Sequence, residues 1–295
     1  MPRPLFWITM KARFLTSSLV LIVAASALAQ RDFSKVEIKA IPVAGNIHML
    51  EGSGGNIDVS VGPDGILIVD NQFAPLAEKI EAALKKIDTG DLKFVLNTHW
   101  HGDHTGGNAH FGKKANIVAH TNVRKRLAGS DGKKKDGLPV ITFDDSLSVH
   151  FNGEEIKIIH LPPGHTDGDS IIHFTGANVV HMGDQFFAGK FPFIDLGSGG
   201  SVAGYARNVG EVLKKIPADA KIIPGHGPLA TVDDLKTFHA MLTETTSIVQ
   251  KAIEADKTLE QVKADGLPEK WKDWGTGFIN TSRWLEITYN SLKQK

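Results

Sequence analysis

The stretch THWHGDHTGG, Thr98–Gly107, holds three histidines and one aspartate within six residues. Side chains two residues apart leave the same face of an extended segment, so His99 and His101 can bind one metal ion. Asp103 and His104 follow directly and can reach a second ion. Imidazole nitrogen and carboxylate oxygen are the usual donors to zinc where thiolates are absent, and the chain has no cysteine. The spacing therefore predicts a metal site.

Three later motifs each place one more candidate ligand beside a glycine: Gly164-His165-Thr166, Gly183-Asp184 and Pro224-Gly225-His226-Gly227. A single histidine is more often structural than ligating, but four motifs together are hard to reach by accident. Seven donors exceed what one tetrahedral ion with an open position requires. They suit two ions that share a bridging carboxylate.

In residue type and order, these motifs resemble those of the metallo-β-lactamase superfamily, and the resemblance runs from about Val36 to His226. It implies two zinc ions, although iron and manganese can occupy such ligands. It also implies that Asp70, at a strand end, braces the ligand loop and fixes the tautomer of a bound imidazole. The implied ligands are His99, His101 and His165 for the first ion, Asp103, His104 and His226 for the second, and Asp184 as the bridge.

Hydrophobic patterning predicts strands in the first half of the chain, followed by a helix whose apolar residues recur every three to four positions. A further strand delivers the histidine-rich loop at its carboxyl end, the usual location of sites in open α/β sheets. The expected strands are Val36–Val43, Ile47–Leu50, Ile57–Val61, Ile66–Asp70 and Phe94–Leu96, and the expected helix is Pro75–Ile87.

A second series follows a polar loop at Gly129–Gly137. Two β-rich series, each flanked by helices, predict an α/β fold. The resemblance implies a four-layer αβ/βα sandwich with the metals at the seam between the sheets. The expected elements are strands Ile156–His160, Ile171–Phe174, Val179–His181 and Ile222–Ile223 and helices Val202–Ile216, Val232–Ala255 and Ser282–Leu292.

The first residues have the pattern of a secretory signal peptide over residues 1–29, followed by a single domain over residues 30–295. A basic pair, Lys11 and Arg13, precedes the apolar run Leu19–Ala25 and the small-residue site Ala27-Leu28-Ala29. Met1 and Met10 are alternative starts. The run is shorter than the roughly twenty residues needed to span a bilayer. We therefore expect a periplasmic or secreted protein without stable membrane insertion after cleavage.

The charge balance argues against a nucleic-acid partner. The chain has 33 basic and 33 acidic residues, and the leader contains three basic residues and no acidic one. The mature net charge is then −3 with histidine neutral, which would not attract phosphates. Without cysteine there is no disulfide, so the core and the metals must hold the fold. Composition leaves the oligomeric state open.

The predicted site favours hydrolysis of a small molecule. Two neighbouring cations lower the pKa of a shared water, and the resulting hydroxide can attack an acyl carbon while one cation polarises the carbonyl. Asp103, besides binding metal, is the candidate catalytic residue that orients this hydroxide. A β-lactamase-like enzyme is the first hypothesis. A lactone, ester or thioester hydrolase with the same metals is the second, and a non-catalytic periplasmic metal-binding protein is the third.

Two departures from zinc β-lactamases bear on the substrate. Many of those enzymes have a cysteine where this chain has Asp184, and Phe187 replaces the lysine that holds their substrate's carboxylate. Lys190, slightly further on, is a candidate substitute, and a solvated loop lysine is the equally weighted alternative. Phe187 is a candidate substrate contact within the aromatic stretch Phe186–Phe193, which either lines the site or belongs to the core.

Two further segments are left open. Gly52–Gly55 is either a mobile flap over the site or, more simply, a hairpin connection. The lactonase branch places a tyrosine near the metals, but the sequence gives no reason to place Tyr205 or Tyr289 there.

Overall fold

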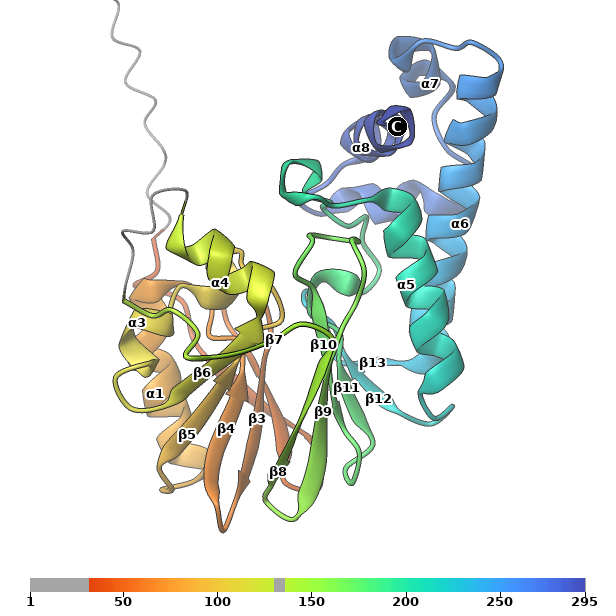
Figure 1. Cartoon of the computed structure of the whole chain (residues 1–295). Coiled ribbons are helices and arrows are strands. Elements are labelled where there is room, and N and C mark those ends of the chain that lie inside the picture. Colours follow the sequence, from red (N-terminus) through yellow and green to blue (C-terminus); the bar gives the residue numbers. More distant parts are fainter. Residues whose placement is uncertain (1–31, 130–135, 295) are drawn as a thin grey trace, which may run out of the picture. The chain divides into compact units, whose positions relative to one another are not determined.

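Two β-sheets with helices against their outer faces make up the unit Phe33–Lys295 in the computed structural model (Figure 1). The structure describes residues 32–129 and 136–294. The expected signal peptide and most of the loop expected at Gly129–Gly137 therefore lie outside the described residues. The predicted α/β sandwich is confirmed, with the order helix, sheet, sheet, helix.

The first sheet joins an antiparallel meander, β1 to β4, to a parallel part, β4 to β7. All five residues of β4 are buried, as expected for a central strand covered on both faces. Its strands follow the order of the sequence: β1 (Lys39–Ala44), β2 (Ile47–Glu51), β3 (Ile57–Gly62), β4 (Gly65–Val69), β5 (Leu92–Leu96), β6 (Asn116–His120) and β7 (Ile141–Phe143).

The second sheet is antiparallel except where β11 and β12 run parallel. Helix α5 (Val202–Lys215) connects these two strands, and α6 (Val232–Glu254) follows the sheet's last strand. In spatial order its strands are β13 (Ala230–Thr231), β12 (Lys221–Ile223), β11 (Val179–His181), β10 (Ser170–Phe174), β9 (Glu154–His160) and β8 (Ser146–Phe151).

The helices begin at recognisable signals. Pro75 lies in the 3₁₀ turn η1 (Ala74–Leu76) that leads into α1 (Ala77–Ile87), and a capping box of Thr231 and Asp234 starts α6. The remaining helices are α2 (Gly102–Thr105), α3 (Asn108–Phe111), α4 (Thr121–Ala128), α7 (Leu259–Asp265) and α8 (Thr281–Lys293), and the remaining 3₁₀ segments are η2 (Gly183–Gln185), η3 (Leu196–Ser198) and η4 (Glu269–Thr276).

The main difference from the expected elements lies at the first strand. It begins at Lys39 rather than Val36, because the amide of Val36 donates to the carbonyl of Phe33 (3.2 Å) and closes a turn. Several short helices and strands were not predicted. These are β6, β7, β8, β13, α2, α3, α4 and α7.

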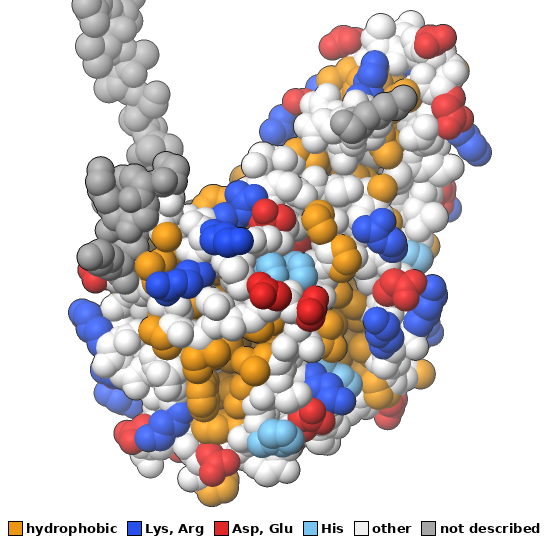
Figure 2. Space-filling model, in the orientation of Figure 1, with side chains coloured by type: hydrophobic (Ala, Val, Ile, Leu, Met, Phe, Trp, Pro, Cys, Tyr) orange, Lys and Arg blue, Asp and Glu red, His pale blue; other side chains and the backbone are white. Residues whose placement is uncertain are grey.

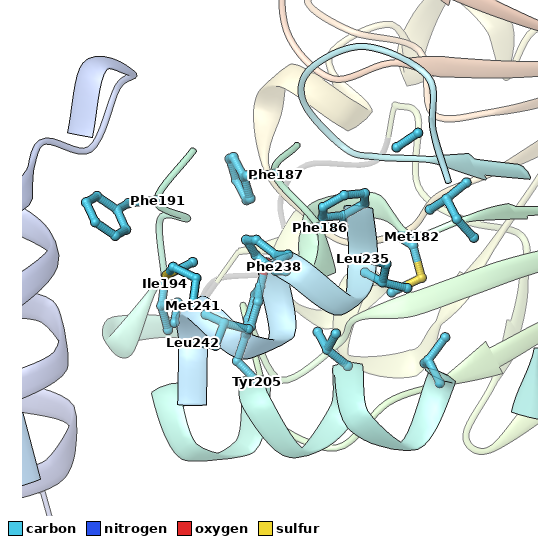
Figure 3. Packing of buried hydrophobic residues seen from close by; sticks show 14 of the residues in the cluster. Met182, Phe186, Phe187, Phe191, Ile194, Tyr205, Leu235, Phe238, Met241 and Leu242 are labelled. Carbon is cyan, nitrogen blue, oxygen red and sulfur yellow. The ribbon is translucent and has the colours of Figure 1, made fainter. Parts of the chain in front are cut away.

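The cores form layers between the sheets and their helices. One cluster fills the space between the two sheets, and another packs α1 against the first sheet. The third lies under α5 and α6 and includes Phe186, Tyr205 and Phe238 (Figure 3). Phe186 and Phe191 are fully buried here. For these two residues the core interpretation of the aromatic stretch is therefore correct.

On the face drawn in Figure 2, basic and acidic side chains are interspersed rather than gathered into one patch of a single sign. Over residues 32–129 and 136–294, the structure contains no helix with the length and apolar character that crossing a membrane requires.

Candidate metal centre

All seven predicted ligands come together where strands end, at one edge of the two sheets. His99 and His101 follow β5, and helix α2 carries Asp103 and His104. Ligands from the second half come after β9, β11 and β12: these are His165, Asp184 and His226. Each half of the chain thus supplies part of one site.

The side chains form two groups, each able to hold one ion. Within each group the candidate ligand atoms lie within 4.8 Å of one another. In the first group, His101 Nδ1 lies 2.8 Å from His165 Nε2. The first group is His99, His101, His165 and Asp184, and the second is Asp103, His104 and His226.

The carboxylate of Asp184 faces both groups. Its Oδ2 lies 3.7 Å from His99 Nε2 and 3.4 Å from His165 Nε2. Its Oδ1 lies 3.1 Å from His104 Nε2 and 3.3 Å from His226 Nε2. One oxygen turned toward each group is the arrangement that a bridging carboxylate requires.

Unpartnered polar atoms at the centre fit a metal site. His99 Nε2, His104 Nε2 and Asp184 Oδ1 are buried and make no hydrogen bond of normal geometry, although the last two atoms lie 3.1 Å apart. A buried polar atom left unpaired costs about 1–3 kcal/mol, so three of them facing one another indicate a missing partner. The donors are only nitrogen and oxygen, which suits zinc and other borderline divalent ions.

The electrostatics of the buried ligands are dominated by burial and by their own mutual contacts. Burial lowers the pKa of His165 to about 4 and holds the pKa of His99 well below its usual value. Both imidazoles are therefore neutral at pH 7, the form that binds a metal. Burial also opposes ionisation of Asp184, but the surrounding imidazoles, His226 first, hold its pKa well below the usual range.

His104 differs from the other buried imidazoles. Burial alone would lower its pKa, but neighbouring carboxylates, Asp184 and then Asp70, outweigh burial and raise the pKa well above the usual value. Without metal this ring keeps a proton between carboxylates. A metal ion must displace that proton, so binding at the second group releases it.

Asp70 lies behind the ligand loop, where the resemblance implies it. Its Oδ2 is 2.7 Å from His104 Nδ1, and its Oδ1 accepts from the amide of Thr98 (2.9 Å). The hydroxyl of Thr98 donates to Oδ2 at 2.6 Å. The carboxylate is fully buried and holds His104 by Nδ1, which leaves Nε2 directed at the second group.

Asp195 is a residue that sequence reasoning missed. Its Oδ2 is 3.0 Å from His101 Nε2, so it holds this imidazole with Nδ1 toward the first group. The hydroxyl of Ser198 donates to the same oxygen (2.6 Å), and the amide of Ser198 donates to Oδ1 (3.1 Å). Asp195 and His101 are 94 positions apart in the sequence, and no local motif marks Asp195.

Tyr205 lies next to the site, although no sequence pattern predicts this position. Its hydroxyl donates to the backbone carbonyl of Asp184 (2.7 Å), and the side chain is fully buried on α5. Tyr205 therefore holds the backbone of Asp184 in place. Tyr289 instead donates to the carbonyl of Lys257 (3.1 Å) and does not contact the site.

The segment Gly52–Gly55 connects β2 to β3, and its contacts favour the hairpin interpretation over a mobile flap. The side-chain amide of Gln72 donates to the carbonyl of Gly55 (2.8 Å), and the amide of Gly55 donates to the carbonyl of Asp103 (3.1 Å). Next to it, the side chain of Asn56 donates to the carbonyls of Pro224 (3.0 Å) and Gly227 (2.8 Å). The hairpin thus fixes ligand loops of both halves.

The two predicted substrate contacts, Phe187 and Lys190, have different surroundings. Phe187 is nearly buried and stacks on His226, with ring centroids 4.9 Å apart and an interplanar angle of 21°. Lys190 is exposed, and its ammonium donates to the hydroxyl of Thr276 at 2.5 Å. Phe187 thus adjoins the second group, whereas Lys190 is engaged with the segment that precedes α8.

Asp169 is a buried carboxylate in the second half of the chain, and it makes the unfolding free energy of the metal-free protein depend on pH. Burial raises the pKa of Asp169 to about 7, although Thr166 and Gln185 donate hydrogen bonds to it. Between pH 4 and 7 the folded state therefore holds a proton that the unfolded chain has lost, and this contribution to stability declines as pH rises.

The matched variant is Asp169→Asn, which does not titrate. We expect the difference in unfolding free energy, native minus variant, to fall between pH 5 and pH 7 by up to about 1.4 kcal/mol per pH unit and to level off above pH 8. Denaturant unfolding of chelator-treated protein measures it. Parallel pH profiles for the two proteins would contradict the shifted pKa.

Comparisons with known proteins agree with this geometry. A family model described as the metallo-beta-lactamase superfamily matches residues 40–256, which include all seven predicted ligands. The chain is 24% identical over 203 residues to a metallo-beta-lactamase type 2 from Bacteroides fragilis, covering 65% of this chain and 77% of that protein. It is 26% identical over 176 residues to a hydroxyacylglutathione hydrolase from Gloeobacter violaceus, covering 59% and 62%.

The solved structure of the DIM-1 metallo-beta-lactamase superposes with a TM-score of 0.61 at 18% identity, over 71% of this chain and 99% of that one, which shows a shared fold. The expectation of a metallo-hydrolase is confirmed at the level of the family. The match of residues 40–256, together with the architecture, shows that the chain belongs to the metallo-β-lactamase superfamily.

Proposed function

We propose that this protein is an exported dinuclear zinc hydrolase that cleaves an acyl bond of a small molecule. The observation that carries the proposal is the carboxylate of Asp184, with one oxygen toward each of two ligand groups. A single structural ion would not need a second set of donors. Iron and manganese can also bind nitrogen and oxygen donors of this kind. Among these metals the donor set favours zinc.

Two ions bound at these groups would lower the pKa of a water and polarise the acyl carbonyl. The protein contributes by placing its own groups around that centre. Asp103 Oδ2 lies 3.4 Å from His226 Nε2, and its side chain is partly exposed at the site, so it can both bind and orient the attacking oxygen. Asp70 and Asp195 fix the rings of His104 and His101 from behind.

Two acyl substrate classes compete at this site. β-Lactam hydrolysis is supported by the similarity to the Bacteroides fragilis protein, and hydrolysis of a thioester, ester or lactone by the similarity to the hydroxyacylglutathione hydrolase. One observation favours the second class: Phe187 stacks on His226 where a carboxylate-binding lysine would stand. A non-catalytic metal-binding role is the third candidate.

The proposal of export rests on the leader pattern of residues 1–29, and it places the mature protein in the periplasm or outside the cell. The net charge of the mature chain supports a small-molecule substrate and gives no reason for a nucleic-acid partner.

The deciding experiment is a hydrolysis assay of the protein from Gln30 onward, with zinc added and with a chelator as the control. The substrates are a chromogenic cephalosporin, a p-nitrophenyl ester, a lactone and an acyl-glutathione thioester. We expect turnover of at least one class, lost with chelator and restored by zinc. Two bound zinc ions without turnover of any class would favour the non-catalytic alternative, and one bound ion would contradict the dinuclear site.

A further inference from the structure

An aromatic surface leads outward from the first ligand group. The ring of Phe193 lies 6.0 Å from the ring of His101 and 6.0 Å from that of His165. Phe278 meets Phe193 edge-on, with ring centroids 6.4 Å apart and an interplanar angle of 81°. A chain of ring contacts therefore leads from the candidate ligands through Phe193 to Phe278.

Phe278 is unusually exposed for a phenylalanine. The residue is 87% exposed. Within the described ranges, the only other exposed large hydrophobic residues are Val140 and Ile141. Those two residues lie together on the first sheet's edge, whereas Phe278 adjoins a site. A lone exposed hydrophobic residue is ordinary on a surface, but one continuous with a ligand-binding centre marks a recognition surface.

The segment that carries Phe278 is held in place on both sides. The amide of Phe191 donates to the carbonyl of Trp274 (3.1 Å), and Lys190 donates to Thr276. Immediately after Phe278, Ile279 is 3% exposed and belongs to the core under α5 and α6. The exposed ring thus projects from an anchored backbone, and a ligand that covers it gains apolar contact at little cost in ordering.

The charged groups near this surface differ in how far they are neutralised. Arg283 pairs with Glu286 at 2.7 Å beside a hollow of about 210 Å³ that Phe193 also lines. The ammonium of Lys190 donates to the hydroxyl of Thr276, a neutral partner that leaves its charge uncompensated. The two phenylalanine rings themselves offer only apolar surface, so the part of a ligand that covers them gains most when it is apolar.

From these contacts we infer that the substrate carries an apolar acyl group, an alkyl or aryl chain, which lies along Phe193 and Phe278. This inference rests on the proposed acyl hydrolysis and adds the class of acyl group. Phe193 is positioned for this role by the metal site itself, because its carbonyl lies 2.7 Å from His165 Nδ1. Phe278 belongs to residues 257–294, beyond the part of the chain that carries the ligands.

The first test compares hydrolysis of p-nitrophenyl acetate and p-nitrophenyl octanoate by the zinc-loaded protein. The leaving group is common to both esters, so it cancels in the ratio. We expect Phe278→Ala to lower kcat/KM for the octanoate about tenfold, as loss of partial burial of a ring predicts, and to change the acetate less than about twofold. The control is Val140→Ala, a truncation of another exposed apolar residue (67% exposed) away from the site, which should leave both values unchanged.

The second test measures binding without turnover. Acetohydroxamate and octanohydroxamate are titrated calorimetrically into zinc-loaded protein, native and Phe278→Ala. We expect the octanoyl compound to bind the native protein at least about tenfold more tightly, and the variant to lose most of that preference. Equal affinities in the native protein, or an unchanged preference in the variant, would overturn the inference.

The two tests separate the inference from the proposed function. If octanohydroxamate binds through Phe278 but no ester, lactone or thioester is hydrolysed, acyl hydrolysis is wrong and the apolar surface stands. If both esters are hydrolysed at rates that do not depend on chain length or on Phe278, hydrolysis stands and the inference of an apolar acyl group is wrong.

Discussion

Replacing Asp184 with asparagine is expected to reduce the bound metal from two ions to one and to lower kcat/KM by more than about 100-fold, because even residues behind the ligands cost 10–100-fold. The native carboxylate directs Oδ2 at the first group and Oδ1 at the second. An amide offers a metal only one neutral oxygen, because its NH₂ group cannot act as a ligand. The ions are counted by elemental analysis after removal of excess zinc.

The matched comparison is Asp195→Asn, which alters a carboxylate that holds the ligand His101 from behind, by the ring nitrogen directed away from the first group. We expect this variant to retain two ions at saturating zinc and to lose about 10–100-fold in zinc affinity, the usual effect of a group behind a ligand. Competition with a fluorescent chelator gives the affinities. If Asp184→Asn still bound two ions with native affinity, the bridging role would be wrong.

Gly55→Ala is expected to have the second large effect, because a methyl group there has no space. A Cβ on residue 55 would lie 2.1 Å from Cε1 of His104 and 2.6 Å from its Nδ1. The ring is fully buried and tied to Asp70, so it cannot turn aside without losing that bond. We expect the free energy of unfolding to fall by about 1–3 kcal/mol and metal affinity to fall about 10–100-fold.

The control is Gly102→Ala, which adds the same methyl group between the ligands His101 and Asp103, at the start of α2. A Cβ there meets no atom within 4 Å, so stability and zinc binding should remain near native. Thermal unfolding with and without zinc measures both effects. Similar losses in the two variants would show that any added methyl group near the ligands, rather than the collision with His104, determines the result.

The ligands were predictable because their signal is local. His99, His101, Asp103 and His104 lie within six residues, and the later ligands stand beside glycines that permit close approach of the backbone. At residue 225, for example, a Cβ would lie 2.2 Å from Asp184 Oδ1, so only glycine fits there. A pattern that combines ligand chemistry with such a requirement can be recognised without the fold.

The supporting residues were not predictable, since their partners are remote in sequence. Asp195 meets a ring 94 positions away, and Tyr205 reaches the carbonyl of Asp184 only once α5 packs on the second sheet. A buried tyrosine on a helix gives the same sequence signal whether it supports a site or fills a core. The anchored exposure of Phe278 likewise depends on tertiary contacts rather than on local pattern.

For the fold, some elements were predicted with nearly the observed bounds and others were missed. The expected strand Val179–His181 has the observed bounds. The expected helix Val202–Ile216 extends one residue beyond the observed end at Lys215. Strand β8 alternates exposed and partly buried residues and pairs with β9, but its serines and histidine dilute the apolar signal. Its existence depends on the hydrogen bonds that β9 offers.

The division of the ligands between the two halves of the chain has a consequence for biogenesis. His99 and Asp103 emerge from the ribosome long before His226, and the hairpin at Asn56 fastens to residues 224–227 only when both are present. No partial chain that ends before His226 contains the second group. Binding of an ion by the second group can therefore only follow the synthesis of His226, and two ions bound as proposed would join early and late parts of the polypeptide.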